Sequence, residues 1–132
     1  MIEMNVLLCA TAETPWLKKD TEETQRLERC FEGLTYVYRD QGLVSLNDVK
    51  KADIIIGYVP VEMLPNAKNL KWLHLGTADV RGYDKADLYE NDFVIVTRGE
   101  AFAAPEAAME KVLDLMAQYF DGDDLDGEIE LN

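Results

Sequence analysis

Residues 52–80 read ADIIIGYVPVEMLPNAKNLKWLHLGTADV, and this stretch decides the fold of the chain. It contains two short apolar runs, at residues 54–56 and 70–75, each followed at once by small or turn-forming residues. Runs of this length and composition are typical of strands buried on both faces, as in a parallel sheet with helices above and below. The segment between the two runs that Pro60 and Pro65 bracket is only a few residues long, so a helix of about one to two turns must carry a right-handed crossover.

Candidate site residues follow from this arrangement, because ligands of open α/β sheets bind where the carboxyl ends of the strands open into loops. Thr77, Ala78 and Asp79 follow the second apolar run, and Tyr58 follows the first. Arg98 stands at the end of the last predicted strand and can face the same crevice. An arginine there either holds a ligand carboxylate or pairs with Asp79, and we favour the ion pair.

The rest of the chain alternates predicted strands with predicted helices. Apolar or alternating runs predict strands at residues 5–10, 34–38 and 93–97. Caps and helical spacing predict helices that start at Asp20 or Thr21 and end near residue 32, that follow Ser45 over residues 46–51, and that follow Pro105 over residues 106–120. The buried face of the first helix is expected to carry Leu27, Cys30 and Phe31.

This order of elements predicts the fold class. Strand and helix alternate five times, which favours a three-layer, flavodoxin-like α/β sandwich with five parallel strands in the order 2-1-3-4-5. Residues 1–120 are expected to form this single lobe. Residues 121–132 are expected to form an acidic C-terminal tail that aids solubility.

Composition excludes several classes of function. Of 132 residues, 26 are acidic and 13 basic, giving a net charge of −13, so we expect neither nucleic acid nor anionic membrane surfaces as partners. No apolar run approaches the roughly 20 residues that span a bilayer. Cys9 and Cys30 are interpreted as small core residues of a cytoplasmic protein, and no metal site is expected. The N-terminus lacks the features of a signal peptide.

The segments ADIIIG and NLKWLHLGTADVRGYD resemble the substrate-binding lobe of the D-isomer-specific 2-hydroxyacid dehydrogenases. The resemblance covers most of residues 4–97 and is most specific over residues 72–83. It implies that backbone N–H groups of the loop after the second run receive a substrate carboxylate. Asp79 stands where that family usually has glycine, and its side chain would crowd and repel an anion.

A cofactor domain is missing from this pattern. The family's dinucleotide site needs a Gly-x-Gly-x-x-Gly turn, and no two glycines here are spaced as Gly-x-Gly. The loop at residues 11–15 carries Glu13 and Pro15, which also disfavours flavin phosphate. Residues 105–125 resemble the family's last helix and tail, and the resemblance implies that the two pieces of the lobe are joined between Asp92 and Lys111. We therefore expect no cofactor in this chain, although the resembled family uses NAD.

The histidine that serves as acid or base for hydride transfer in the resembled family also has no counterpart in this sequence. Arg98 and Gly99 stand where the family's Pro-His would follow Thr97, if that strand is the one before the last helix. If the strand instead closes the first piece of the lobe, the family's catalytic histidine belongs to the missing domain. The only histidine, His74, lies within a predicted strand and is interpreted as structural.

Two functions remain open. The first is an isolated substrate-binding lobe, of a family that transfers hydride between NAD(H) and 2-hydroxy or 2-keto acids, without activity by itself. The alternative is a non-catalytic binding module for a small carboxylate or a protein partner. A phospho-receiver domain is disfavoured because the third strand ends in Gly57 and Tyr58 rather than in an aspartate.

A homodimer is a further expectation. Loss of a domain would uncover apolar surface at Phe102, Ala103 and Ala104, and exposed apolar patches favour association. The net negative charge opposes it.

Overall fold

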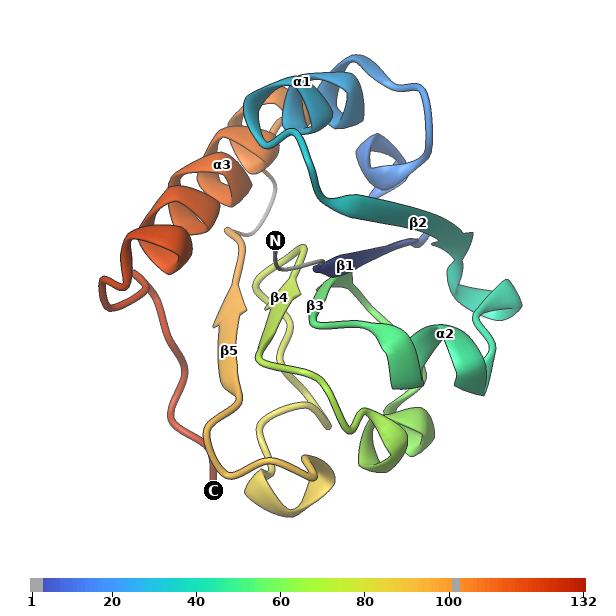
Figure 1. Cartoon of the computed structure of the whole chain (residues 1–132), viewed down its shortest axis with the longest axis vertical. Coiled ribbons are helices and arrows are strands. Elements are labelled where there is room, and N and C mark those ends of the chain that lie inside the picture. The colour runs from blue at the N-terminus through green and yellow to red at the C-terminus, as the bar shows by residue number, and fades with distance from the viewer. Residues whose placement is uncertain (1–3, 101–102) are drawn as a thin grey trace.

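The computed structural model describes residues 4–100 and 103–132 of the chain (Figure 1). Its strands form one parallel sheet in the order β2-β1-β3-β4-β5, which confirms the predicted α/β fold class and strand order. The strands are β1 (Asn5–Ala10), β2 (Thr35–Asp40), β3 (Ile54–Gly57), β4 (Trp72–Leu75) and β5 (Ile95–Arg98). The α-helices are α1 (Glu22–Cys30), α2 (Leu46–Lys51) and α3 (Pro105–Asp121). The 3-10 helices are η1 (Pro15–Leu17), η2 (Gln41–Leu43), η3 (Val61–Asn66) and η4 (Ala86–Leu88).

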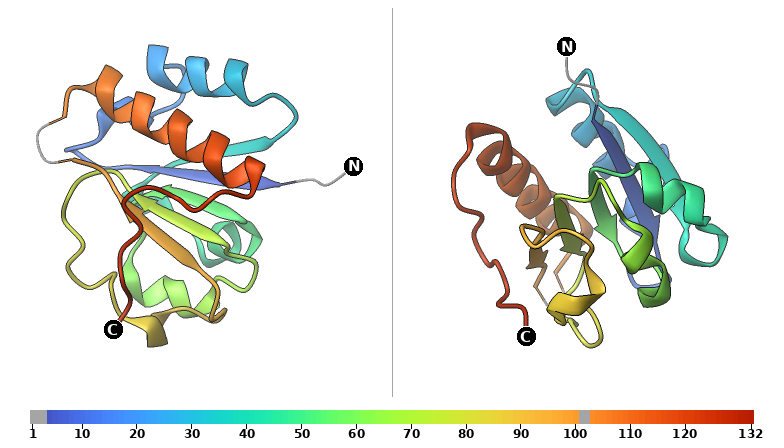
Figure 2. Two further views of the ribbon diagram at one scale, coloured as in Figure 1. Left: turned by 90° about the vertical axis from the view of Figure 1, so that its left-hand side faces the viewer. Right: turned by 60° about the horizontal axis from the view of Figure 1, so that its bottom comes forward.

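Helices cover both faces of the sheet. Helices α1 and α3 lie side by side on one face, and α2, η3 and η4 lie on the other (Figure 2). The isoleucines of β3 show why the sheet is buried on both sides: Ile54 and Ile56 pack under α1 and α3, while Ile55 packs toward α2 and η3. All three are fully buried, as a run of apolar residues in a central parallel strand requires.

Local signals in the sequence set the helix boundaries. Thr21 and Ser45 are the N-caps of α1 and α2, and each side-chain oxygen accepts a hydrogen bond from the backbone N–H three residues later, at 3.1 Å in both cases. Pro105 begins α3, and Gly122 ends it in the left-handed conformation, with φ of 78°. No helix in the described ranges is both long and apolar enough to cross a membrane.

Two local predictions need correction. Cys30 is exposed rather than in the core, because it is the last residue of α1 and lies beyond the buried positions Thr24 and Leu27. Strand β5 begins at Ile95, two residues later than predicted, and the side chain of Phe93 is 67% exposed. The short helix predicted for the crossover between β3 and β4 is present as η3. It is a 3-10 helix with Pro65 inside it, since proline cannot supply the N–H that an α-helix would use.

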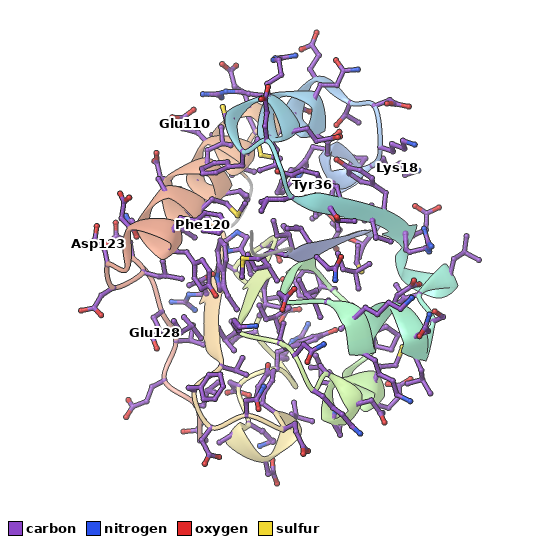
Figure 3. The ribbon with its side chains drawn as sticks, viewed as in Figure 1. Lys18, Tyr36, Glu110, Phe120, Asp123 and Glu128 are labelled. Carbon is purple, nitrogen blue, oxygen red and sulfur yellow. The ribbon has the colours of Figure 1, made fainter. Side chains whose placement is uncertain are left out.

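The acidic segment after α3 is not a detached tail. Leu125 is buried beneath α3, and Glu128 forms an isolated antiparallel bridge with Thr97 of β5. The acidic side chains Asp123 and Glu128 lie on the outer rim of the molecule (Figure 3). The segment therefore keeps its charges in solvent, as a solubilising role requires, while its backbone returns along the edge of the sheet.

Candidate functional site

The loops at the carboxyl ends of the strands form a groove of about 480 Å³. It is lined by Glu13, Trp16, Gly76, Thr77, Ala78, Asp79, Glu100, Ala103 and Ala108. A larger groove, of about 570 Å³, lies between α1 and α3, but its walls are mostly charged surface side chains, including the Arg26–Glu110 ion pair. The groove at the strand ends is the better candidate site because parallel sheets place their binding loops there.

Tyr58 anchors the loop that follows β4. Its hydroxyl lies 2.5 Å from the hydroxyl of Thr77 and donates to the carbonyl of Asp79 at 2.8 Å. A phenol has one hydrogen, so the Thr77 hydroxyl donates to the Tyr58 oxygen. Burial is the main cause that raises the pKa of Tyr58, which remains a neutral donor. The structure thus brings three of the predicted site residues, Tyr58, Thr77 and Asp79, into one hydrogen-bonded group.

Two further tyrosines support this loop from beneath. The ring of Tyr83 meets that of Tyr58 edge-on, with centroids 5.5 Å apart, and its hydroxyl donates to the carbonyl of Val59 at 2.6 Å. The hydroxyl of Tyr89 donates in turn to the carbonyl of Tyr83, also at 2.6 Å. These bonds fix the segment after β4 against the end of β3.

Asp79 pairs with Arg81 and not with Arg98. The guanidinium of Arg81 donates to both carboxylate oxygens of Asp79 at 3.1 Å, and its backbone N–H donates to Oδ1 at 3.0 Å. The side-chain bond from Arg81 is the main cause that lowers the pKa of Asp79. The predicted ion pair with Arg98 is therefore wrong, because a partner two residues away closes a local turn at a smaller entropic cost.

Arg98 is not brought into the groove. Side chains alternate along a strand, and Thr97, the residue before Arg98, points toward α3 together with its neighbour His74. Arg98 therefore leaves the sheet on the opposite side, where its side chain is exposed. Within the described ranges it forms no ion pair.

The backbone of the loop offers donors to the groove. In the described part of the chain, the N–H groups of Thr77 and Ala78 have no hydrogen-bond acceptor. Gly76 and Gly99 allow the loops after β4 and β5 to approach closely, since a Cβ on Gly99 would lie 2.8 Å from the carbonyl oxygen of Gly76. Thr77 and Ala78 both line the groove, so its wall contains two adjacent residues whose amides are available as donors to an anion.

The charges around these amides oppose an anion. The groove is lined by three acidic residues, Glu13, Asp79 and Glu100, and only Asp79 has an arginine partner among the described residues. These acids do not form a metal site: nowhere in the described ranges do three His, Cys, Asp or Glu side chains gather closely enough to hold an ion. The groove thus combines amide donors with a negative rim.

Six residues that line the groove were absent from the candidates that the sequence suggested, and Glu13, Trp16 and Glu100 have the largest side chains among them. Glu13 and Trp16 belong to the loop after β1, and their distance along the chain from Thr77 hides their proximity. The parallel pairing of β1 with β3 and of β3 with β4 brings these loops together. The strand order was the signal that could have found them. Of the predicted dimer patch, Ala103 is half-buried, Ala104 is exposed, and Phe102 lies outside the described residues.

His74 belongs to the core beneath α3, as the sequence indicated. Its side chain is 1% exposed, and its Nδ1 lies 2.7 Å from the hydroxyl oxygen of Thr97. The same oxygen accepts a hydrogen bond from Nε1 of Trp72 at 2.8 Å, so its own hydrogen is free to donate to the imidazole. Burial, and secondarily the charge of Lys111, lowers the pKa of His74 to about 3.

Neither a protein-family model nor a curated protein matches this chain. Solved structures do resemble it. One is a D-isomer specific 2-hydroxyacid dehydrogenase family protein from Aeromonas salmonicida subsp. salmonicida A449, at 17% identity and a TM-score of 0.53. Another is phosphoglycerate dehydrogenase from Lactobacillus plantarum, at 23% identity and a TM-score of 0.50. The alignments cover 90% and 89% of this chain.

This chain has the fold of one dehydrogenase lobe. It spans only 34% and 36% of the lengths of those two chains, as a single lobe would. The resemblance found in the sequence is thereby confirmed at the level of the fold.

Proposed function

We propose that this chain is a substrate-binding lobe of the D-isomer-specific 2-hydroxyacid dehydrogenase type, which binds a small 2-keto or 2-hydroxy acid and does not transfer hydride by itself. The loop after β4 is the observation that carries the proposal. Thr77 and Ala78, whose N–H groups have no acceptor in the described part of the chain, line a groove of about 480 Å³ at the place where open α/β sheets bind ligands.

The residues present do not fit a dinucleotide. A pyrophosphate needs a glycine-rich turn between a strand and a helix, so that backbone amides can approach it. The turn after β1 instead carries the exposed carboxylate of Glu13, and Pro15 removes an N–H at the start of η1. No step that uses bound NAD is therefore assigned to this chain.

The one histidine is poorly placed for proton transfer. A general acid or base must reach the substrate and have a pKa near the working pH. His74 is enclosed by the core, and its pKa of about 3 keeps the imidazole neutral. This supports a lobe that binds rather than one that reacts.

The connection between β5 and α3 also supports a lobe without an inserted domain. Residues 99–104 alone join the end of β5 to the start of α3. This join falls within the range between Asp92 and Lys111, where the sequence resemblance expects the lobe to be closed. Binding is expected to be weak, because Glu13, Asp79 and Glu100 repel the ligand carboxylate.

Thermal unfolding with pyruvate and with its uncharged amide tests the proposal. A ligand that binds only the folded state raises the melting temperature by mass action. We expect pyruvate and lactate, at millimolar concentration and constant ionic strength, to raise it, while pyruvamide does not. Equal effects of acid and amide, or no shift with any of a series of 2-keto and 2-hydroxy acids, would contradict the proposal.

A further inference from the structure

The two edges of the sheet differ in how they meet solvent. Strand β2 forms one edge, and its exposed residues Thr35, Arg39 and Asp40 are polar. Strand β5 forms the other edge with the sequence Ile-Val-Thr-Arg, of which only Arg98 is exposed. An apolar edge with free backbone groups is a template for pairing with another chain, so folded proteins cover such an edge or place charges on it.

Residues 128–132, which we call the edge segment, cover β5. Glu128 bridges Thr97 in antiparallel orientation, and the N–H of Ile129 donates to the carbonyl of Val96 at 2.8 Å. At its far end, the N–H of Asn132 donates to the carbonyl of Asp84 at 2.8 Å. The edge segment therefore lies along the edge of β5, to which an isolated bridge and one backbone hydrogen bond join it.

Side chains of the edge segment alternate as in a strand with one buried face. Ile129 and Leu131 are half-buried against the core on the α2 side of the sheet, whereas Glu128 and Glu130 are exposed. This alternation of apolar and acidic residues is the pattern that the edge of β5 accepts.

A separate anchor holds the linker before the edge segment. Leu125 is buried on the α3 side, and Asp126 makes two hydrogen bonds with the side chain of Gln118, at 2.9 and 3.0 Å. Gly127 follows with φ of 76°, a conformation that favours glycine and allows the chain to turn. Contacts with α3 thus hold the linker independently of the contacts that the edge segment makes with β5.

We propose that the edge of β5 is a strand-addition site for the edge segment of a second copy of this chain. The second copy supplies the same side chains and the same backbone groups, so every contact described above can form between two molecules. The covalently attached segment has a high effective concentration and normally occupies the site. When it is released, the site accepts the segment of another molecule, as in domain swapping.

A chain that ends at Asp126 tests this, because it keeps the anchor Leu125 and loses the edge segment. A fluorescein-labelled peptide of residues 122–132 stands in for the second copy, and fluorescence anisotropy measures binding. The control peptide carries Ile129→Asp and Leu131→Asp. We expect saturable binding of the native peptide, weaker by more than about tenfold for the control peptide, because burial of two apolar side chains is lost.

The full chain provides a second comparison. It should bind the native peptide more weakly than the shortened chain does, since its own segment competes for the site. If the shortened chain is unfolded alone, recovery of its circular dichroism with the native peptide and not with the control supports the proposal equally. A shortened chain that does not distinguish the two peptides, or an unfolded one that neither peptide restores, overturns it. Neither result bears on ligand binding in the groove, which thermal unfolding tests separately.

Discussion

The hydroxyl oxygen of Thr97 lies 2.7 Å from Nδ1 of His74, in the layer between the sheet and α3. The two residues are in register on neighbouring strands β4 and β5, and both are almost completely buried. With Trp72 they form a polar cluster in an otherwise apolar core, and every buried side-chain polar atom in the described residues has a partner. A buried cluster of this kind is costly to disturb, because an unpartnered polar atom keeps its desolvation penalty.

His74 should make the stability of the fold depend on pH. Its pKa falls from the ordinary value of 6.5 to about 3 in the folded state, so the unfolded chain binds a proton that the folded chain does not. The contribution of neutral His74 to the free energy of unfolding is complete above the ordinary pKa. It is lost as the pH falls from there toward the pKa of the folded state. Between about pH 5 and about pH 6, the free energy of unfolding should rise by about 1.4 kcal/mol per pH unit because of this group.

Urea unfolding of the native chain and of His74→Gln at several pH values measures this dependence. The variant should lose the slope attributed to the imidazole in that window, whatever its absolute stability. Parallel slopes for the two proteins would contradict a buried neutral histidine.

Thr97→Val should destabilise the fold by about 2 kcal/mol, because it leaves Nε1 of Trp72 and Nδ1 of His74 without a partner. Thr97→Ser is the matched control, since it keeps the hydroxyl and removes only a methyl group. Chemical unfolding of both variants provides the comparison. Equal stability of the valine and serine variants would show that the hydroxyl contributes nothing.

Asp79→Asn should improve binding of 2-keto acids. The substitution removes one negative charge from the rim of the groove, and we expect the dissociation constant for pyruvate to fall by about threefold to fivefold at low salt. Asp92→Asn makes the same change in net charge at the other end of the sheet, before β5, and should leave affinity unchanged. Isothermal titration calorimetry of the two variants with pyruvate measures this difference. An equal gain in affinity in both variants would assign the effect to net charge alone.

Tyr58→Phe should loosen the loop after β4 and cost about 1 kcal/mol of stability, because the carbonyl of Asp79 and the hydroxyl of Thr77 lose their shared partner. Hydrogen exchange of the amides at residues 77–80 should become faster. Tyr36→Phe also removes one tyrosine-to-carbonyl hydrogen bond, between Tyr36 and Phe31, far from the groove. It should leave those amides unchanged, and faster exchange in both variants would argue against a local role for Tyr58.

The fold was predictable because its signals are local. The fully buried run at residues 54–56, the caps Thr21 and Ser45, and Gly122 after α3 each determine one element through short-range chemistry. The order of the strands followed from the number and connection of these elements.

The site was only partly predictable, because its walls come from loops that are distant in sequence. The hydrogen bonds that join Tyr58 to Thr77 and Asp79 depend on side-chain directions that no periodicity reveals. The Asp79–Arg81 pair was not predicted because it depends on the backbone conformation of the turn at residues 79–81, which the sequence pattern does not determine. The docking of residues 128–132 was missed because a high acidic content hid the alternation of Ile129 and Leu131.

Oxidation of NADH by a 2-keto acid, followed by absorbance in the presence of the purified chain, tests the central claim most directly. A chain that binds the 2-keto acid but lacks both a dinucleotide site and an accessible general acid should give the same rate of NADH oxidation as buffer. This should hold for every 2-keto acid in the series. Turnover that scales with protein concentration would contradict the account.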